Sequence, residues 1–377
     1  MKISMKKKIL YYFLIIIFCL ILSNKCNAES EDALLNNKLF YIKNAYTGHY
    51  LDVAGGIAKG GTNVQQYEFN GSDAQKWYIE HQGNGIYVIC SMVGATYTGN
   101  TAQVHYALDV DNGINQNGTQ IHIWDLAKGD TQRFTFSETP NGTYVIYTKC
   151  SNNEKVVSLS NNLCNNGVNI HQWEHSYHCH DQWIMEPVYL DSEMAVKYAK
   201  RNYNKTLLPY PDLQDFGGNC TNFVSQCLLA GGWHQDNNWY VKKKNMDNER
   251  VMNVEQLNSS WNLADPSPWI SAKQFKKKFI DSKNTQKFKG SQILENPSKI
   301  YQLSYFKGDV IQIAENVLGI GILGDAKHSM IITDYNYNGD NSSFKMTYQS
   351  ANTLNKDLLE IANNYKNDFF IFYDFTE

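Results

Sequence analysis

Residues 51–77 read LDVAGGIAKGGTNVQQYEFNGSDAQKW, and residues 108–134 and 157–183 align with them without a gap. Each segment opens on a short apolar stretch with a polar centre, reaches a glycine ten positions later, and meets an aromatic residue after six more. The matching positions are Leu51-Asp52-Val53, Leu108-Asp109-Val110 and Val157-Ser158-Leu159, then Gly61, Gly118 and Gly167, then Tyr67, Trp124 and Trp173. Such agreement indicates an internal threefold repeat.

Strands rather than helices are expected in this half of the chain. Short apolar stretches such as Tyr87-Val88-Ile89 and Tyr144-Val145-Ile146 alternate with Gly-Thr, Asn-Gly and Gly-Asn turns. A threefold all-β repeat that closes on itself has few open strand edges. The pattern therefore predicts a β-trefoil.

The ends of the three repeats carry the residues of a known family. They read Gln75-Lys76-Trp77, Gln132-Arg133-Phe134 and, in degenerate form, Asp181-Gln182-Trp183. Here residues 37–187 resemble the ricin-type (ricin-B-like) lectins, whose repeats end in Gln-x-Trp. The resemblance implies a carbohydrate-binding domain and a glycan-bearing surface as partner.

The same resemblance implies two sugar sites. Repeat one offers Asp52, Gln65, Tyr67 and Gln75, and repeat two offers Asp109, His122, Trp124 and Gln132. A carboxylate accepts hydroxyl hydrogen bonds, and an aromatic ring covers the apolar face of a sugar. Repeat three has Ser158 in place of the aspartate, so we expect it to be structural. Ala74 and Thr131 replace an asparagine common in sugar-binding members, which is compatible with a weak or lost site.

The first 28 residues read as a secretory signal. Lysines precede an apolar run from Ile9 to Leu22, and cleavage is expected after Ala28. An uncleaved anchor would have a similar pattern, although the run is short for a membrane span. Removal takes away five lysines and no acid, so the formal charge falls from −3 to −8. The sequence therefore predicts a secreted or cell-surface protein, with neither nucleic acid nor, after cleavage, a membrane as partner.

Six cysteines remain after cleavage, and an exported chain permits disulfides, with Cys150 and Cys164 as a plausible pair. A histidine-rich run at residues 171–180 invites a zinc interpretation, but it lacks finger spacing. A surface loop is the expectation there. We predict no metal and no cofactor.

A second domain is expected from about residue 190, with the boundary near Pro187. Residues 192–203 have helical spacing behind Ser192 as the expected N-cap. Residues 216–232 read FGGNCTNFVSQCLLAGG, with apolar positions that follow the spacing of a buried helix. Cys220 falls in its first turn, where the helix dipole favours a thiolate. Cys220 is therefore the predicted nucleophile.

A thiolate needs a base, and residues 188–377 contain two histidines, His234 and His328. His328 opens a predicted strand that follows another at 308–313, which is typical of the papain-like arrangement. His234 would need to fold straight back onto the helix. Asn352, after the next strand, is the predicted residue that orients the imidazole, with Asp334 as the less favourable alternative.

Residues 190–377 resemble an amidase domain family of secreted bacterial proteins, related to the NlpC-type cell-wall peptidases. The resemblance rests on residues 195–199, 218–226, 260–261, 308–309 and 328–329. It implies an α+β papain-like or NlpC-like cysteine hydrolase that acts on a peptide or amide substrate, as in a cell wall. Asn219 replaces the usual aspartate, and Asn352 replaces a histidine before Thr353.

The sequence thus predicts a two-domain, secreted, carbohydrate-binding amidase or peptidase. Two alternatives stay open. The second domain has lost catalysis and the protein is a lectin or adhesion protein, or the lectin directs an effector to host glycans.

Overall fold

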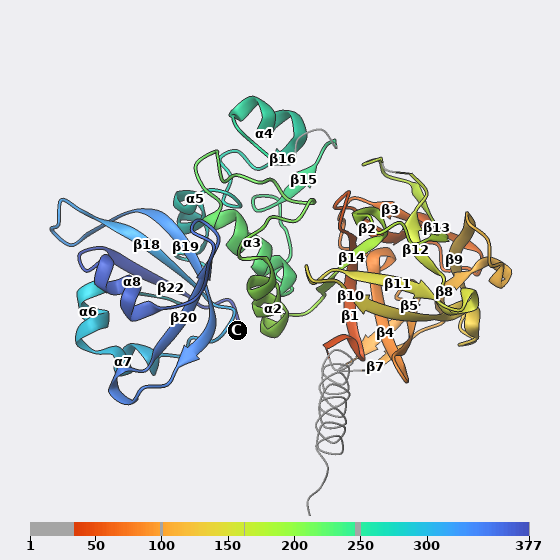
Figure 1. The fold of residues 1–377 in the computed structure, drawn as a ribbon, viewed down its shortest axis with the longest axis horizontal. Helices are drawn as coiled ribbons and strands as arrows, with labels where there is room; N and C mark the ends of the chain where they lie inside the picture. The colour runs from red at the N-terminus through yellow and green to blue at the C-terminus, as the bar shows by residue number, and fades with distance from the viewer. Residues whose placement is uncertain (1–33, 99–100, 162, 246–249, 377) are drawn as a thin grey trace, which may run out of the picture.

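The computed structural model describes residues 34–98, 101–161, 163–245 and 250–376. The predicted signal segment, residues 1–28, lies outside them. Figure 1 shows two halves, with the all-β half at one side and a sheet with helices at the other. Helices α2 (Ser192–Asn202) and α3 (Cys220–Ala230) lie between the C-terminal sheet and the all-β half.

The first half is the predicted all-β trefoil. Twelve of the described strands join in one antiparallel sheet that returns on itself, since β14 pairs with both β1 and β11. The strands are β1 (Lys38–Asn44), β2 (Tyr50–Val53), β3 (Thr62–Tyr67), β4 (Lys76–Gly83), β5 (Ile86–Ser91), β8 (Tyr106–Val110), β9 (Thr119–Asp125), β10 (Arg133–Glu138), β11 (Tyr144–Thr148), β12 (Lys155–Leu159), β13 (Val168–Glu174) and β14 (Gln182–Pro187). A short hairpin, β6 (Thr96–Thr98) with β7 (Thr101–Gln103), extends beyond it.

The three glycines of the repeat close the trefoil. Gly61 N donates to Ile123 O, Gly118 N to Gln172 O, and Gly167 N to Gln66 O, each to a strand of another repeat. All three have φ between 83° and 85°, which favours glycine because other residues pay a steric penalty there. This cyclic set of hydrogen bonds is why a glycine recurs at one step of each repeat.

The aromatic residues that end the repeats fill the trefoil core. Trp77, Phe134 and Trp183 are fully buried in one apolar cluster. Trp77 Nε1 donates to Leu51 O and Trp183 Nε1 to Val157 O, both at 3.0 Å, so the buried indole N–H groups are satisfied. These side chains are therefore structural.

The C-terminal half is built on a six-stranded antiparallel sheet in the order β17-β22-β18-β19-β20-β21. Its strands are β17 (Thr285–Lys289), β18 (Val310–Val317), β19 (Ile322–Asn336), β20 (Ser343–Tyr348), β21 (Thr353–Asp357) and β22 (Phe369–Tyr373). A separate hairpin joins β15 (Val241–Lys243) to β16 (Trp261–Leu263), and the remaining described helices are α4 (Val254–Ser260), α5 (Ala272–Phe279), α6 (Gly290–Glu295), α7 (Pro297–Tyr301) and α8 (Leu358–Asn364).

The two faces of this sheet have separate apolar cores. Ile331 faces a cluster that contains residues of α2, α3 and α5, whereas Met330 and Ile332 face a cluster with residues of α6, α7 and α8. Successive side chains of a strand point to opposite faces. Which face a residue of β19 occupies therefore decides whether it can reach α3.

The helix α3 confirms its prediction from the sequence. It runs from Cys220 to Ala230, its residues after Cys220 are buried, and Gly231 follows as the C-cap. The N-cap of α2 differs from the expectation, because the Asp191 side chain, rather than Ser192, accepts the hydrogen bond from Met194 N. Asp191 has two oxygens to accept, so it can also pair with Lys38.

A buried lysine lies at the interface between the two halves. Lys43 Nζ lies 3.3 Å from Glu186 Oε1 within the trefoil and 3.2 Å from the hydroxyl of Tyr210 in the second half. Burial lowers the pKa of Lys43, and Glu186 opposes that effect. Near the end of α3, His234 Nε2 lies 2.8 Å from Val188 O. Specific side-chain contacts thus hold the two domains together.

The expected Cys150–Cys164 disulfide is not formed. Cys150 Sγ instead lies 3.6 Å from Gln172 Oε1, on the strand that Gly118 contacts. Among the described residues, no helix is long and apolar enough to cross a membrane.

Candidate functional site

The predicted sugar site of repeat one surrounds a cavity. Asp52, Gln65 and Tyr67 line a hollow of about 500 Å³. Asp52 and Gln65 are opposite each other on β2 and β3, and Gln65 Nε2 donates to Asp52 Oδ1 at 3.0 Å. Burial raises the pKa of Asp52, and hydrogen bonds from Gln65 and Gln75 oppose the rise. An acceptor-rich hollow beside a half-exposed phenol ring suits a sugar.

The turn after Tyr67 completes this cavity. Asn70, Ser72 and Asp73 also line it, although they were not predicted from the sequence. The signal that was available is the turn-forming Asn-Gly-Ser-Asp sequence of residues 70–73.

Repeat two has an aspartate and an aromatic ring at the same positions, with His122 in place of Gln65. His122 Nε2 lies 3.3 Å from Asp109 Oδ1, and Thr131 Oγ1 donates to Asp109 Oδ2 at 2.9 Å. Both carboxylate oxygens therefore have partners within the protein. Trp124 is 48% exposed and lies beside Gly61 of repeat one.

One difference between the repeats lies just before the signature glutamine. Ala74 stands in repeat one where Thr131 stands in repeat two, and alanine has no hydroxyl. Asp52 therefore lacks the internal donor that Thr131 gives to Asp109. Repeat three has Ser158 opposite His171, with no carboxylate at this position.

The two glutamines predicted to hold sugars have another position. Gln75 and Gln132 are buried, and their Nε2 atoms donate to Glu68 O and Asp125 O respectively. Gln75 Oε1 also accepts from Asn70 N. Each amide therefore closes the loop that shapes its site, and Gln75 also hydrogen-bonds to Asp52, so their part in holding a sugar stays a prediction.

Cys220 is the first residue of α3 and is half-buried. Its Sγ lies 3.8 Å from Thr221 Oγ1. Asn219, before it, makes no side-chain cap: its Oδ1 accepts from Leu213 N, and its Nδ2 donates to Thr206 Oγ1. An aspartate could not supply that second bond, so Asn219 fixes the loop in front of the nucleophile position.

His328 does not meet Cys220. It lines a cavity of about 370 Å³ with Met330 and Ile361, which belong to the cluster on the α8 face of the sheet. Its ring packs edge-on against Tyr348 at 4.8 Å, and burial lowers its pKa to about 4. Helix α3 packs on the other face, and among the contacts of the described residues none joins the imidazole to the Cys220 thiol, so the predicted pair stays a prediction.

The contact between α3 and β19 is made one residue further on. Thr221 Oγ1 and Ser329 Oγ lie 2.9 Å apart, and Gln312 Nε2 donates to Ser329 Oγ at 2.8 Å. Cys220 and His328 thus each precede one residue of this contact in the chain. The His328 side chain lies on the other face of the sheet.

The predicted orienting residue is also elsewhere. Asn352 is exposed with φ of 48°, and among the hydrogen bonds of the described residues the one at His328 Nδ1 involves Ser350 Oγ, at 3.3 Å. The sequence analysis did not single out Ser350. Asp334, the alternative, pairs with Lys200 at 3.0 Å.

The histidine-rich loop is held by its own side chains. His175 Nδ1 lies 2.9 Å from Asp181 Oδ2, and His180 Nε2 lies 3.1 Å from Ser176 Oγ. Asp181 occupies the position of the buried signature glutamine in this repeat. Asp181 Oδ2 accepts from Ser176 N at 2.9 Å, as Gln75 Oε1 accepts from Asn70 N in repeat one.

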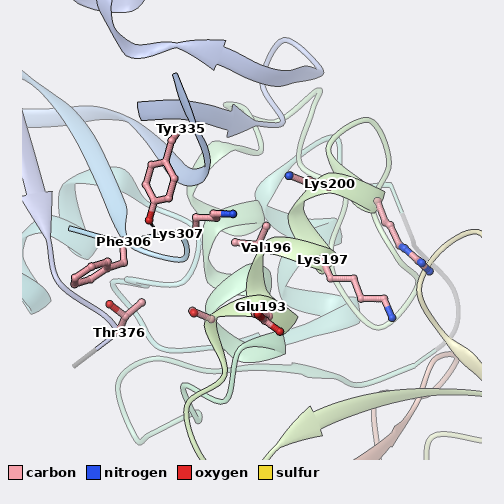
Figure 2. A pocket seen from close by; sticks show the side chains of 10 residues that line it. Glu193, Val196, Lys197, Lys200, Phe306, Lys307, Tyr335 and Thr376 are labelled. Carbon is pink, nitrogen blue, oxygen red and sulfur yellow. Dashed lines mark hydrogen bonds between the residues drawn. The ribbon is translucent and has the colours of Figure 1, made fainter. Parts of the chain in front are cut away.

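A larger cavity, of about 780 Å³, lies on α2 and is shown in Figure 2. Lys197 and Lys200 extend from α2 toward it, with Lys307 across from them. Lys197 pairs with Glu138, and Lys200 pairs with Asp334. These ammonium groups are thus largely balanced, and neither Cys220 nor His328 lines the cavity.

A trefoil with a polar hollow in its first repeat is followed by a sheet-and-helix domain with a cysteine at a helix start. Residues 33–97 and 94–173 match the family described as "Ricin-type beta-trefoil lectin domain-like", and residues 189–373 match "Putative amidase domain". The chain is thus similar to the ricin-type lectin family over its first half and to this amidase family over its second half, in the predicted order.

Individual relatives match only part of the chain. An uncharacterized protein, YhbB of Bacillus subtilis (strain 168), is 40% identical over 55 residues, which are 13% of this chain and 17% of that protein. The match thus spans about a sixth of that relative. Among solved structures, the designed threefold protein ThreeFoil is 25% identical, with 39% of this chain and 96% of that chain covered, at a TM-score of 0.35. The C-half of the earthworm R-type lectin, in complex with GalNAc, is 21% identical over 40% and 98%, at 0.31.

Proposed function

We propose that this protein is a secreted or cell-surface amidase that is held on its substrate by a sugar bound in repeat one. The observation that carries the sugar site is the cavity lined by Asp52, Gln65 and Tyr67, where the carboxylate is held by the amides of Gln65 and Gln75 and no hydroxyl stands at the position of Thr131. Solved relatives support the ligand class, since the earthworm lectin is described with GalNAc and the Macrolepiota procera lectin with lactose.

The amidase chemistry is assigned to Cys220. Its half-buried thiol stands at the first residue of α3, beside the backbone N–H groups of the first helical turn. The thiolate attacks the amide carbonyl, and the Cys220 N–H is a candidate donor to the oxyanion. The fold is papain-like in this proposal, with a peptide of a cell wall as the substrate.

His328 serves as the base in this mechanism, which sets a structural requirement. Its imidazole must leave the cavity beside Tyr348 and reach the α3 face of β19. It then accepts the thiol proton and later gives it to the leaving amine. Asn352 or Ser350 orients the ring, and their separate substitution distinguishes the two.

A second function is favoured by the observed position of His328. With the imidazole on the far face, the contacts of the described residues include none between a histidine and Cys220, and in this alternative the protein is a non-catalytic lectin or adhesion protein. A host-directed effector would use the same glycan-binding activity to recognise glycans on host cells. Reactivity of Cys220 separates these functions from the amidase.

Iodoacetamide labelling of the exported protein, from about pH 5 to about pH 9, tests the assignment when Cys220 is followed by mass spectrometry. The amidase proposal predicts labelling well below the ordinary thiol pKa of about 8.5, and loss of that reactivity in His328→Ala. His234→Ala is the matched control and should label as the wild type does. An inert Cys220 assigns the protein to the non-catalytic alternative.

The sugar site is tested separately by glycan-array binding. Asp52→Ala should abolish binding, whereas Asp109→Ala should leave most of it. Equal effects of the two substitutions would contradict the assignment to repeat one.

A further inference from the structure

A second cavity adjoins the repeat-one site and lies between the domains. It measures about 540 Å³ and has walls from both halves of the chain. The trefoil contributes Phe69 and Asn70, and the second domain contributes Gln235, Asp236, Asn237, Tyr240, Lys242 and Asn262. Asn70 lines both this cavity and the repeat-one cavity. The two hollows are therefore neighbours that meet at one residue.

The walls of this inter-domain cavity are held in place. Lys242 Nζ of the second domain lies 2.7 Å from Glu68 Oε2 of the trefoil. Phe69 stacks against His234 at 6.1 Å, with an angle of 29° between the rings. Gln235 Oε1 accepts from Val241 N. The cavity is thus part of the domain interface and needs no further closure to exist.

Its chemistry suits a neutral, hydroxyl-rich ligand. Asp236 pairs with Lys278, and Lys242 pairs with Glu68, so the charges at the walls are balanced. Carboxamides both donate and accept hydrogen bonds, and Tyr240 adds a hydroxyl and a ring face. A strongly charged or wholly apolar ligand would leave these groups unpaired.

We propose that the repeat-one site binds an oligosaccharide rather than a single sugar, with the following sugars lying in the inter-domain cavity. The second domain then contributes Asn237, Tyr240 and Asn262 to glycan recognition. This inference rests on the proposed sugar site of repeat one and extends it. It also directs the bound chain along the amidase domain, so that ligand length and not only sugar type sets affinity.

Calorimetric titration of the full exported chain tests this with two probe series. These are galactose with its β-linked di-, tri- and tetrasaccharides, and N-acetylglucosamine with the corresponding chitin oligosaccharides. For the series that binds, affinity should rise about tenfold or more from the monosaccharide to the trisaccharide, because added hydroxyls gain partners. The double variant Asn237→Ala/Asn262→Ala should remove that rise and leave the monosaccharide affinity unchanged.

The controls separate this inference from the proposed sugar site. Asp52→Ala should abolish binding of every length, and Gln302→Ala, an exposed amide on the far side of the sheet, should change nothing. Monosaccharide binding without a length dependence, or an equal loss at all lengths in the double variant, would overturn the inter-domain site alone. Absence of binding in both series would overturn it together with the repeat-one site.

Discussion

Thr221 Oγ1 and Ser329 Oγ lie 2.9 Å apart and join the start of α3 to β19. Cys220 precedes the first of these residues, and His328 precedes the second. Because neighbouring residues of a strand face opposite sides of the sheet, the contact that brings Ser329 to α3 turns His328 away from it. The start of α3 and β19 thus meet through the hydroxyls of Thr221 and Ser329, and not through Cys220 and His328.

The buried position of His328 predicts a dependence of stability on pH. The pKa of the imidazole is lowered to about 4 by burial, whereas in the unfolded chain it is about 6.5. Between these values the unfolded chain binds the proton more readily, so stability is lost as the pH falls from about 6.5 to about 4. The loss should be at most about 3 kcal/mol, because the ring keeps some contact with water.

Urea unfolding of the wild type and His328→Phe across this pH range measures that effect. The free energy of unfolding of the variant should fall less than that of the wild type as the medium is acidified. His105→Phe, at an exposed position, is the control. Parallel curves for the wild type and His328→Phe would show that the imidazole is not held in the cavity.

The difference between Ala74 and Thr131 predicts that one substitution gives repeat one the hydrogen bonding of repeat two. Ala74→Thr introduces a hydroxyl that can donate to Asp52, as Thr131 does to Asp109. We expect it to weaken glycan binding about tenfold, because an Asp52 oxygen that would accept from a sugar hydroxyl then accepts from the threonine. Ala74→Val, of similar size but without the hydroxyl, tests whether bulk alone is responsible. Equal losses in the two variants would contradict the hydrogen-bond explanation.

The sequence was informative where a feature repeats or is periodic. The threefold repeat predicted the trefoil, and the apolar spacing predicted α3 to within its C-cap. The Asp109 site could not be judged in this way, because its occupancy depends on a hydroxyl 22 positions away, at Thr131. Contacts of that kind appear only when the repeat is folded.

The side of the sheet on which His328 lies also has a local cause, which no sequence pattern reveals. Ile313 pairs with His328, but Ala314 pairs with Ala326, so Lys327 is an extra residue in β19. Ala326 faces the core that contains α3 residues, and regular alternation from it would have put His328 on the same face. A bulge of one residue reverses the faces of all that follows.

The thiols of the chain should differ in reactivity. Burial raises the pKa of Cys90 to about 12 and raises that of Cys227 well above its ordinary value. Both side chains are fully buried, whereas Cys220 is half-buried at a helix start. In the native protein at about pH 8, iodoacetamide should modify Cys220 and leave Cys90 and Cys227 unmodified until denaturant is added. Native labelling of Cys227 would show that α3 is not packed as described.

The buried pair Lys43 and Glu186 predicts a large cost for removing one partner. Both side chains are at most 2% exposed, and Tyr50 also donates to Glu186 Oε2 at 2.8 Å. Glu186→Ala leaves an ammonium group buried without its carboxylate, so we expect a loss of about 3–5 kcal/mol in unfolding free energy. Asp130→Ala, which breaks the exposed pair with Arg133, should cost under about 1 kcal/mol.

Denaturant unfolding followed by tryptophan fluorescence measures both losses. Lys43 also touches Tyr210 of the second domain, so the Glu186 substitution should loosen the interface as well as the trefoil. A transition that splits into two steps in Glu186→Ala, but stays single in Asp130→Ala, would show that this pair couples the domains. Equal and small losses in the two variants would mean that water reaches Lys43 and that the charge is not buried.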